Sequence, residues 1–162
     1  MPMPCYLTLE GNQQGKIEGS SEVQGHKGKI LVQAVEHLVE LPKNPQTGLP
    51  SGKRQHLGIT LTKEIDKSSP KIFQALTSGE QMKEVILEFY RISPKGTEEK
   101  YYTIKLEKAV IVSARTWVPN CLAPENRQYG HMEDIGLTYE KIVWTWESDG
   151  IEAEDSWLAP KA

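Results

Sequence analysis

The residue types that serve as nucleophiles and metal ligands are few and scattered in this chain. The histidines and cysteines are His26, His37, His56, His131, Cys5 and Cys121. His131 and Glu133 have the spacing of the first half of a zinc deaminase motif, but the Pro-Cys-x-x-Cys sequence that would complete it is absent. Cys121 stands alone in the sequence, so a Cys121–His131 nucleophile pair is a weak hypothesis. These residues predict neither a metal site nor a catalytic site.

Motifs that bind phosphates or form nucleophile elbows are also missing. Residues 25–29 mimic part of a P-loop, but Val23 stands where the first glycine is required and Ile30 where the hydroxyl is required. The sequence contains no dinucleotide-binding glycine fingerprint and no Gly-x-Ser-x-Gly motif. We therefore expect a protein that is not an enzyme and that uses no cofactor.

Two tryptophans offer a different kind of site. Trp144 and Trp146 are two residues apart and share one face of an expected strand. They fit core packing, or a platform for a ligand, and the second reading describes a small-molecule-binding β-barrel. His37 lies between apolar neighbours, which suits an interface or core position better than a ligand. The paired acidic residues are expected on solvated faces: Glu98–Glu99, Glu133–Asp134 and Glu154–Asp155.

The bulk composition indicates one globular domain. The chain has 162 residues, of which 38% are hydrophobic and 25% charged. A formal net charge of −3 shows no basic bias, so nucleic acid is not the expected partner. No run approaches the roughly 20 apolar residues that a membrane helix needs, so no membrane insertion is expected. Residues 1–11 lack the basic and apolar regions of a secretory signal, which predicts cytoplasmic folding with reduced cysteines.

The clearest local signal is a strand that leads into a helix at residues 55–79. Leu57, Ile59 and Leu61 alternate with polar or small residues, as in a half-buried strand. Lys63 falls in phase with this apolar face. Its charge would therefore point toward the core. Either the strand bends there and moves the side chain out of the core, or a carboxylate pairs with the charge, for which Glu64 and Asp66 are the nearby candidates.

The helix is predicted at about residues 69–78. Pro70 suits its first turn, and Gly79 can adopt the positive φ that ends a helix. Side-chain oxygens for the N-cap are available from Asp66, Ser68 and Ser69. The apolar face comprises Ile72, Phe73, Ala75 and Leu76, and the opposite face Lys71, Gln74, Thr77 and Ser78.

Residues 29–41 carry apolar side chains on both sides of an extended chain. They predict a strand packed on both faces, against its own core and against a second sheet or a neighbouring subunit. A helix is the competing interpretation, although the β-branched residues favour a strand. Residues 41–53 contain three prolines and two glycines, so they form an extended loop. This loop is either a flexible insertion or an arm that docks on another molecule.

Further alternating segments complete the expected sheets. Apolar positions alternate along three strands through Val85, Leu87 and Phe89, then Tyr102, Ile104 and Leu106, then Val110, Val112 and Ala114. The last strand, residues 131–147, changes phase at Glu140 and Lys141, which predicts a bulge or a bend between sheets. The predicted fold is mainly β, an antiparallel two-sheet β-barrel in a single domain of residues 1–147. Residues 148–162 are expected to form a loosely held acidic tail.

Ordered motifs along almost the whole chain give a resemblance to a known family. Residues 52–56, 59–60 and 63–70 carry Gly-Lys-Arg-Gln-His, Ile-Thr and Lys-Glu-Ile-Asp-Lys-Ser-Ser-Pro. The series continues at residues 75–80, 89–91, 101–107, 119–121, 131–134 and 139–145. In these motifs the chain resembles the haemolysin-coregulated protein (Hcp) family, the inner-tube proteins of bacterial type VI secretion. The likeness thins after Glu147.

The resemblance implies a homohexameric ring whose copies stack into a hollow tube. The tube is tipped by a spike protein, wrapped by a contractile sheath and loaded with effector proteins in its lumen. Such proteins leave the cytoplasm without a cleaved signal peptide. They are not enzymes unless a toxin domain follows, and about fifteen residues after the last expected strand leave no room for one.

The resemblance also directs attention to two sets of residues. The loop of residues 41–53 looks like the extended loop that family members use in ring contacts, and Asn44, Gln46 and Thr47 at its tip are expected to mediate stacking. On the helix, Lys71, Gln74 and Ser78 are expected to line the ring or the lumen.

Overall fold

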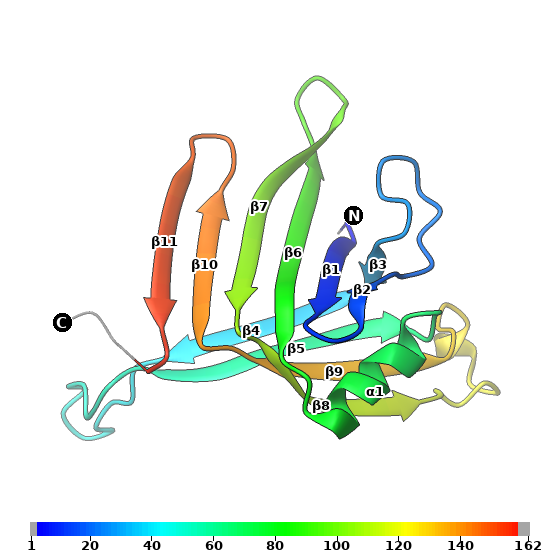
Figure 1. Ribbon diagram of the computed structural model, residues 1–162. Coiled ribbons are helices and arrows are strands. Elements are labelled where there is room, and N and C mark those ends of the chain that lie inside the picture. The colour runs from blue at the N-terminus through cyan, green and yellow to red at the C-terminus, as the bar shows by residue number, and fades with distance from the viewer. Residues whose placement is uncertain (1–2, 159–162) are drawn as a thin grey trace.

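The computed structural model describes residues 3–158, which form two antiparallel sheets and one α-helix (Figure 1). The seven-stranded sheet has the order β11-β10-β7-β6-β1-β2, and β3 pairs with β1 beside β2. Its strands are β1 (Cys5–Gly11), β2 (Gly15–Ile17), β3 (Ile30–Val32), β6 (Met82–Ile92), β7 (Glu98–Glu107), β10 (Lys141–Trp146) and β11 (Ile151–Ser156). The four-stranded sheet has the order β4-β5-β9-β8. Its strands are β4 (Ala34–Glu40), β5 (Gln55–Glu64), β8 (Val110–Trp117) and β9 (Met132–Thr138).

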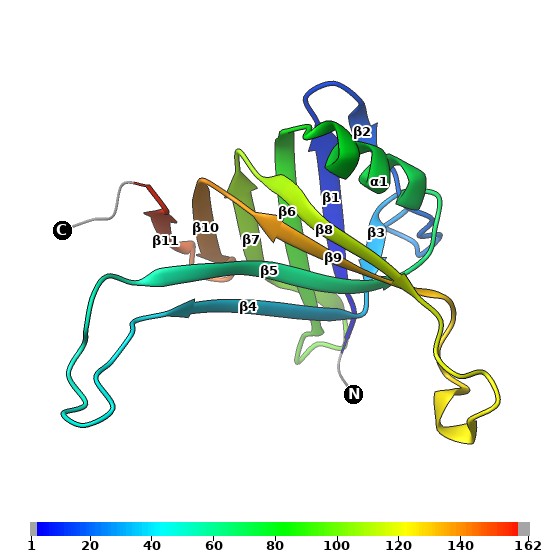
Figure 2. The same cartoon turned by 90° about the horizontal axis from the view of Figure 1, so that it is seen from below.

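The strands of the two sheets run across one another, as Figures 1 and 2 show. The chain changes sheet at three short corners: between β3 and β4 at Gln33, between β7 and β8 at Lys108 and Ala109, and between β9 and β10 at Tyr139 and Glu140. It changes sheet once more through the helix that joins β5 to β6. The corner between β9 and β10 confirms the bend predicted from the phase change at Glu140 and Lys141. Corners of this kind let one strand run contribute to two orthogonally packed sheets.

The mainly β class, with two antiparallel sheets and one short helix, is confirmed. The two ladders do not join into a closed barrel: each remains a separate sheet with its own edges. The core lies between them and is built from inward-facing aliphatic side chains that are almost fully buried. They include Leu7, Leu9, Ile59, Leu61, Val85, Leu87, Ile104, Leu106, Ile135, Leu137 and Ile142.

Residues 29–41 form two short strands in place of one long strand. Ile30 and Val32 point into the core from β3 of the seven-stranded sheet and are buried, whereas Val35, His37 and Val39 face inward from β4 and are only half-buried. The inward phase therefore changes at the corner, because the backbone turns from one sheet to the other. This explains why both sides of the segment carry apolar residues.

Two inward positions predicted from strict alternation are wrong. Leu57 is 57% exposed, because β5 has an extra residue opposite Leu38 where the register with β4 shifts. Gly58 adopts a φ of +78° at this bulge, and the buried set of β5 resumes at Ile59. Val112 is likewise 51% exposed, because the β8–β9 register shifts next to it and Ile111 takes the inward position.

The helix α1 (Ser69–Ser78) has the predicted boundaries. Its C-terminus is closed by Gly79 at φ 69°. Ser68 occupies the N-cap without a side-chain capping bond. The turn is instead held by the Asp66 carboxylate, which accepts from the Ser68 N–H at 3.0 Å, and by the Ser69 hydroxyl oxygen, which accepts from the Asp66 N–H at 3.1 Å.

The C-terminal segment departs from the expected loose tail. Ile151–Ser156 forms β11, which pairs with all of β10 as an antiparallel edge strand. The sequence conceals this pairing because residues 151–154 of the strand are exposed, so no alternation of buried apolar residues marks it. The remaining residues of the predicted tail beyond 158 lie outside the described residues.

A fully buried lysine joins β5, β9 and the start of α1. The Lys63 ammonium donates to the Glu64 carbonyl at 2.9 Å, the Asp66 carboxylate at 3.0 Å and the Ser69 hydroxyl at 3.3 Å. The predicted carboxylate partner is therefore Asp66, while Glu64 contributes only its backbone. Burial acts to raise the pKa of Asp66, but hydrogen bonds from Ser68 and the Lys63 charge outweigh it and hold that pKa below its usual value.

Glu133 completes this cluster and corrects its predicted solvated position. Its side chain is fully buried, and Oε2 lies 3.7 Å from Lys63 Nζ. This is an ion-pair distance, and neither carboxylate oxygen has a hydrogen-bond partner among the described residues. The Glu133 carboxylate therefore depends on the Lys63 charge for its compensation.

We predict that Gly58→Ala destabilises the protein more than Gly96→Ala. Both glycines have positive φ, but a Cβ at Gly58 would lie 2.6 Å from the Leu137 carbonyl oxygen, whereas nothing lies within 4 Å at Gly96. Backbone strain and this collision together should lower the free energy of unfolding by about 3 kcal/mol, against about 1 kcal/mol for strain alone. Urea unfolding followed by tryptophan fluorescence measures both. Equal losses would show that β9 yields to the added methyl group.

Replacing the buried lysine, Lys63→Met, should lower the free energy of unfolding by about 3–5 kcal/mol, because it leaves Glu133 charged, buried and unpaired. The double variant Lys63→Met/Glu133→Met should recover part of that loss. Lys83→Met is the matched control, since its side chain is 67% exposed in a surface pair with Glu10, and it should change stability by less than about 0.5 kcal/mol. A Lys63→Met protein as stable as the control would show that Glu133 needs no cation.

Candidate assembly surfaces

The loop between β4 and β5 projects from one end of the four-stranded sheet (Figure 2). We call residues 41–53 the arm. Its backbone is organised by its own hydrogen bonds, from the Asn44 N–H to the Leu49 carbonyl and from the Gly48 N–H to the Asn44 carbonyl, both 2.8 Å. A bridge between Lys43 and Pro50 closes it further down. The arm is thus a folded hairpin-like projection.

The three residues predicted for ring stacking lie at the exposed tip of the arm. The Asn44 carbonyl Oδ1 accepts from the Gln46 N–H at 2.8 Å, and the Thr47 hydroxyl accepts from the Leu49 N–H at 3.3 Å. Asn44 and Thr47 therefore shape the turn. Their role in stacking remains a prediction.

The exposed apolar and charged groups of the arm were not predicted from the sequence. Leu41 and Leu49 are 51% and 66% exposed, and Lys43 and Lys53 are exposed as well. The arm contains no acidic residue. Leucines within a proline- and glycine-rich loop were the available signal, since a loop with no partner gains nothing by exposing them.

The base of the arm is fastened to the C-terminal strand. The Asp155 carboxylate accepts from Arg54 Nε at 2.9 Å and lies 2.7 Å from His56 Nε2. The other nitrogen of this buried imidazole, Nδ1, is 2.7 Å from the Tyr139 hydroxyl. Burial acts to raise the pKa of Asp155, but the hydrogen bonds from Arg54 and His56 prevail and lower it. This cluster fixes where the arm leaves the sheet.

The helix lies at the other end of the four-stranded sheet from the arm (Figure 2). Its buried side is formed by Ile72 and Ala75, with Leu76 partly buried against the core. Lys71, Gln74 and Ser78 are exposed on the opposite side. This exposed face of the helix is available for contacts. That it lines a ring or its lumen remains a prediction.

The four-stranded sheet has two outer edges, β4 and β8. Within residues 3–158, the only pairing on either outer edge is an isolated bridge from Val110 to Gln81. The sheet face turned away from the core exposes Leu38, Leu57 and Val112 by 49%, 57% and 51%. Unpaired edges present free N–H and C=O groups that pair readily with another strand.

The residues considered for chemistry are separated or lack partners. No group of three or more potential metal ligands occurs among the described residues. Cys121 and His131 do border one surface hollow, in the loop that contains the 3₁₀ helix Pro124–Asn126, but no hydrogen bond between them is found there. The exposed Cys121 thiol therefore lacks the hydrogen-bonded base that activates a nucleophile.

The two tryptophans fit packing better than ligand binding. Trp144 is partly buried against the core and donates from Nε1 to His37 Nε2 at 3.2 Å, which places His37 in a supporting position. Trp146 lies against Tyr101 and Arg91, with the guanidinium 5.2 Å from its ring centre. Neither tryptophan borders the principal hollows of the molecule, so this geometry gives a small-molecule-binding barrel no support. Among the described residues, no helix is long and apolar enough to cross a membrane.

Comparison with known proteins gives consistent matches. Residues 6–146 match the family model "Type VI secretion system effector, Hcp". The chain is 40% identical over 171 aligned positions to the "Major exported protein" of Pseudomonas aeruginosa, covering 100% of this chain and 99% of that one. Among solved structures, a mutant of Hcp1 from Escherichia coli EAEC 042 is 35% identical with a TM-score of 0.84 and coverage of 96% and 99%. The secreted protein Hcp3 of Pseudomonas aeruginosa is 34% identical with a TM-score of 0.80 and the same coverage. The chain therefore belongs to the Hcp family of type VI secretion system proteins.

Proposed function

We propose that this chain assembles into hexameric rings that stack as the inner tube of a type VI secretion machine. The observation that carries the proposal is the pair of outer edges of the four-stranded sheet, β4 and β8, which within residues 3–158 have no outer pairing beyond the bridge from Val110 to Gln81. The two edges differ, so pairing β4 of one copy with β8 of the next is a head-to-tail contact. Contacts of this type close into a ring when a whole number of equal rotations from one copy to the next completes a full turn.

In such a ring, the open face of the four-stranded sheet lines the lumen. The opposite face is covered by the seven-stranded sheet and cannot be exposed. The lumen would then present Leu38, Leu57 and Val112 among polar side chains, a mixture suited to holding effector proteins without one fixed sequence. The E. coli and P. aeruginosa relatives, named Hcp1 and Hcp3, share this fold.

The remaining partners follow from the same role. The tube would be tipped by a spike protein and surrounded by a contractile sheath, and Asn44, Gln46 and Thr47 of the arm would contribute to stacking. The chain would be made in the cytoplasm and then exported, as the name of its relative from P. aeruginosa indicates for that protein. Its work is mechanical and structural, and no step of it requires catalysis.

The assembly is tested directly by the mass and shape of the purified protein. Native mass spectrometry should show a species of six chains, and negative-stain microscopy should show rings and short stacks. Because edge pairing is an equilibrium, the fraction in rings should rise with concentration. A chain that stays monomeric at every concentration would contradict the proposal.

The helix face can be located in the same rings. Gln74→Cys, in a Cys121→Ser background, should react with a bulky maleimide-polyethylene glycol more slowly in rings than in dissociated chains, because the ring shields Lys71, Gln74 and Ser78. Lys95→Cys, at the exposed β6–β7 turn, is the matched control and should react equally in both states. Equal rates at position 74 would place the helix on the outer surface of the ring.

A further inference from the structure

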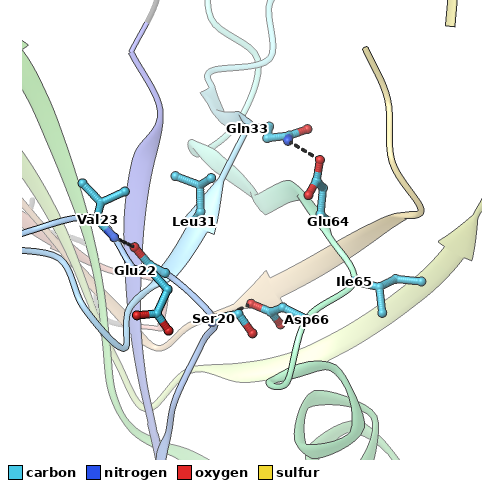
Figure 3. Close-up of a pocket in the computed structure, with 9 residues that line it drawn as sticks. Ser20, Glu22, Val23, Leu31, Gln33, Glu64, Ile65 and Asp66 are labelled. Atoms are coloured by element: carbon cyan, nitrogen blue, oxygen red, sulfur yellow. Dashed lines mark hydrogen bonds between the residues drawn. The ribbon is translucent and has the colours of Figure 1, made fainter. Parts of the chain in front are cut away.

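A hollow of about 290 Å³ opens where β5 ends and the chain turns toward α1 (Figure 3). It is formed by segments distant in sequence: the loop after β2, the β3–β4 corner and the turn before α1. Its apolar walls are Val23, Leu31 and Ile65, which are 47%, 36% and 43% exposed. Three aliphatic side chains left in contact with water around one concave site favour occupation by an apolar group.

The same hollow is acidic. Glu22, Glu64 and Asp66 line it, and no lysine or arginine does. The Asp66 carboxylate accepts from the buried Lys63 ammonium at 3.0 Å, so its charge is already compensated. Glu22 and Glu64 are exposed, and within residues 3–158 neither carboxylate forms an ion pair. The hollow therefore presents a pair of negative charges without a cation.

The other polar groups of the hollow add hydrogen-bond acceptors. The Gln33 amide donates from Nε2 to the Glu64 carboxylate at 3.2 Å, as Figure 3 shows, which leaves its carbonyl oxygen as an acceptor. The hydroxyl oxygen of Ser21, a residue that is 9% exposed, accepts from the Val23 N–H at 3.4 Å and has a second lone pair. An occupant that carries positive charge and donates several hydrogen bonds suits this lining, because charge-assisted hydrogen bonds are the stronger ones.

We propose that this hollow is a binding site for a small aliphatic diamine. One terminal ammonium would donate to Glu22 and the other to Glu64, and the methylene chain between them would contact Val23, Leu31 and Ile65. The two positive charges would match the two carboxylates that lack a cation. A monoamine would leave one of these carboxylates uncompensated, and a diol would leave both.

The size of the hollow favours a small molecule over a partner protein. Pockets that bind small molecules start at about 300 Å³, and this hollow lies close to that limit. A stable protein–protein interface buries about 800 Å² on each partner, which a single recess of this size does not supply. All of the lining residues come from one chain, so the site does not depend on the proposed ring.

Calorimetric titration of the full chain with cadaverine tests the site. We expect saturable binding of one cadaverine per chain, about tenfold tighter than the binding of pentylamine, which has the same carbon chain but a single ammonium. Pentanediol, which has no charge, should give no saturable signal. Added salt should weaken the binding of cadaverine, because it screens exposed charges.

Single substitutions assign the groups. Glu22→Gln and Glu64→Gln each remove one charge with little change of shape, so in either variant the preference for cadaverine over pentylamine should disappear. Val23→Ser should weaken both amines alike, because both place methylene groups against this wall. Glu36→Gln is the matched control: Glu36 is exposed on β4 and does not border the hollow, so both affinities should be unchanged.

The outcomes decide the proposal without reference to assembly. Equal affinities for cadaverine and pentylamine in the unmodified chain would overturn it, as would a preference for cadaverine that survives both glutamate substitutions. The absence of any saturable cadaverine signal would overturn it as well. Ring formation is measured separately by native mass spectrometry, so failure of the diamine site would leave the proposed function intact, and failure to form rings would leave the diamine site intact.

Discussion

The position of the buried Lys63 ammonium constrains the region where β5 ends and α1 begins. A buried charge needs a carboxylate and further hydrogen bonds close by, and the chain supplies these from three elements. The ion pair with Glu133 holds the end of β5 against β9, and the hydrogen bond to Ser69 places the first turn of α1 beside them. The turn from β5 to α1 carries Glu64, Ile65 and Asp66, so the same cluster also sets one wall of the acidic hollow. Moving the lysine would displace the helix and the hollow together.

Local chemistry explains what could be predicted from the sequence. The helix limits, its Gly79 end and the change of sheet near Glu140 depend on residues close together in the chain. The wrong predictions concern side chains whose inward or outward direction depends on how their strand pairs with a neighbouring strand. Leu57 and Val112 were assigned to the wrong face because a bulge shifts the phase, and a bulge is defined only by the register with a neighbouring strand.

Long-range contacts explain the other failures. Glu133 has the appearance of a surface acid, and only the fold brings Lys63 within ion-pair distance. The strand β11 is acidic and weakly patterned, and its existence depends on the free edge of β10. The hollow is assembled from residues more than forty positions apart, so no linear motif could mark it. The prolines and glycines of the arm mark it in the sequence, whereas the exposure of its leucines and lysines is seen only in the fold.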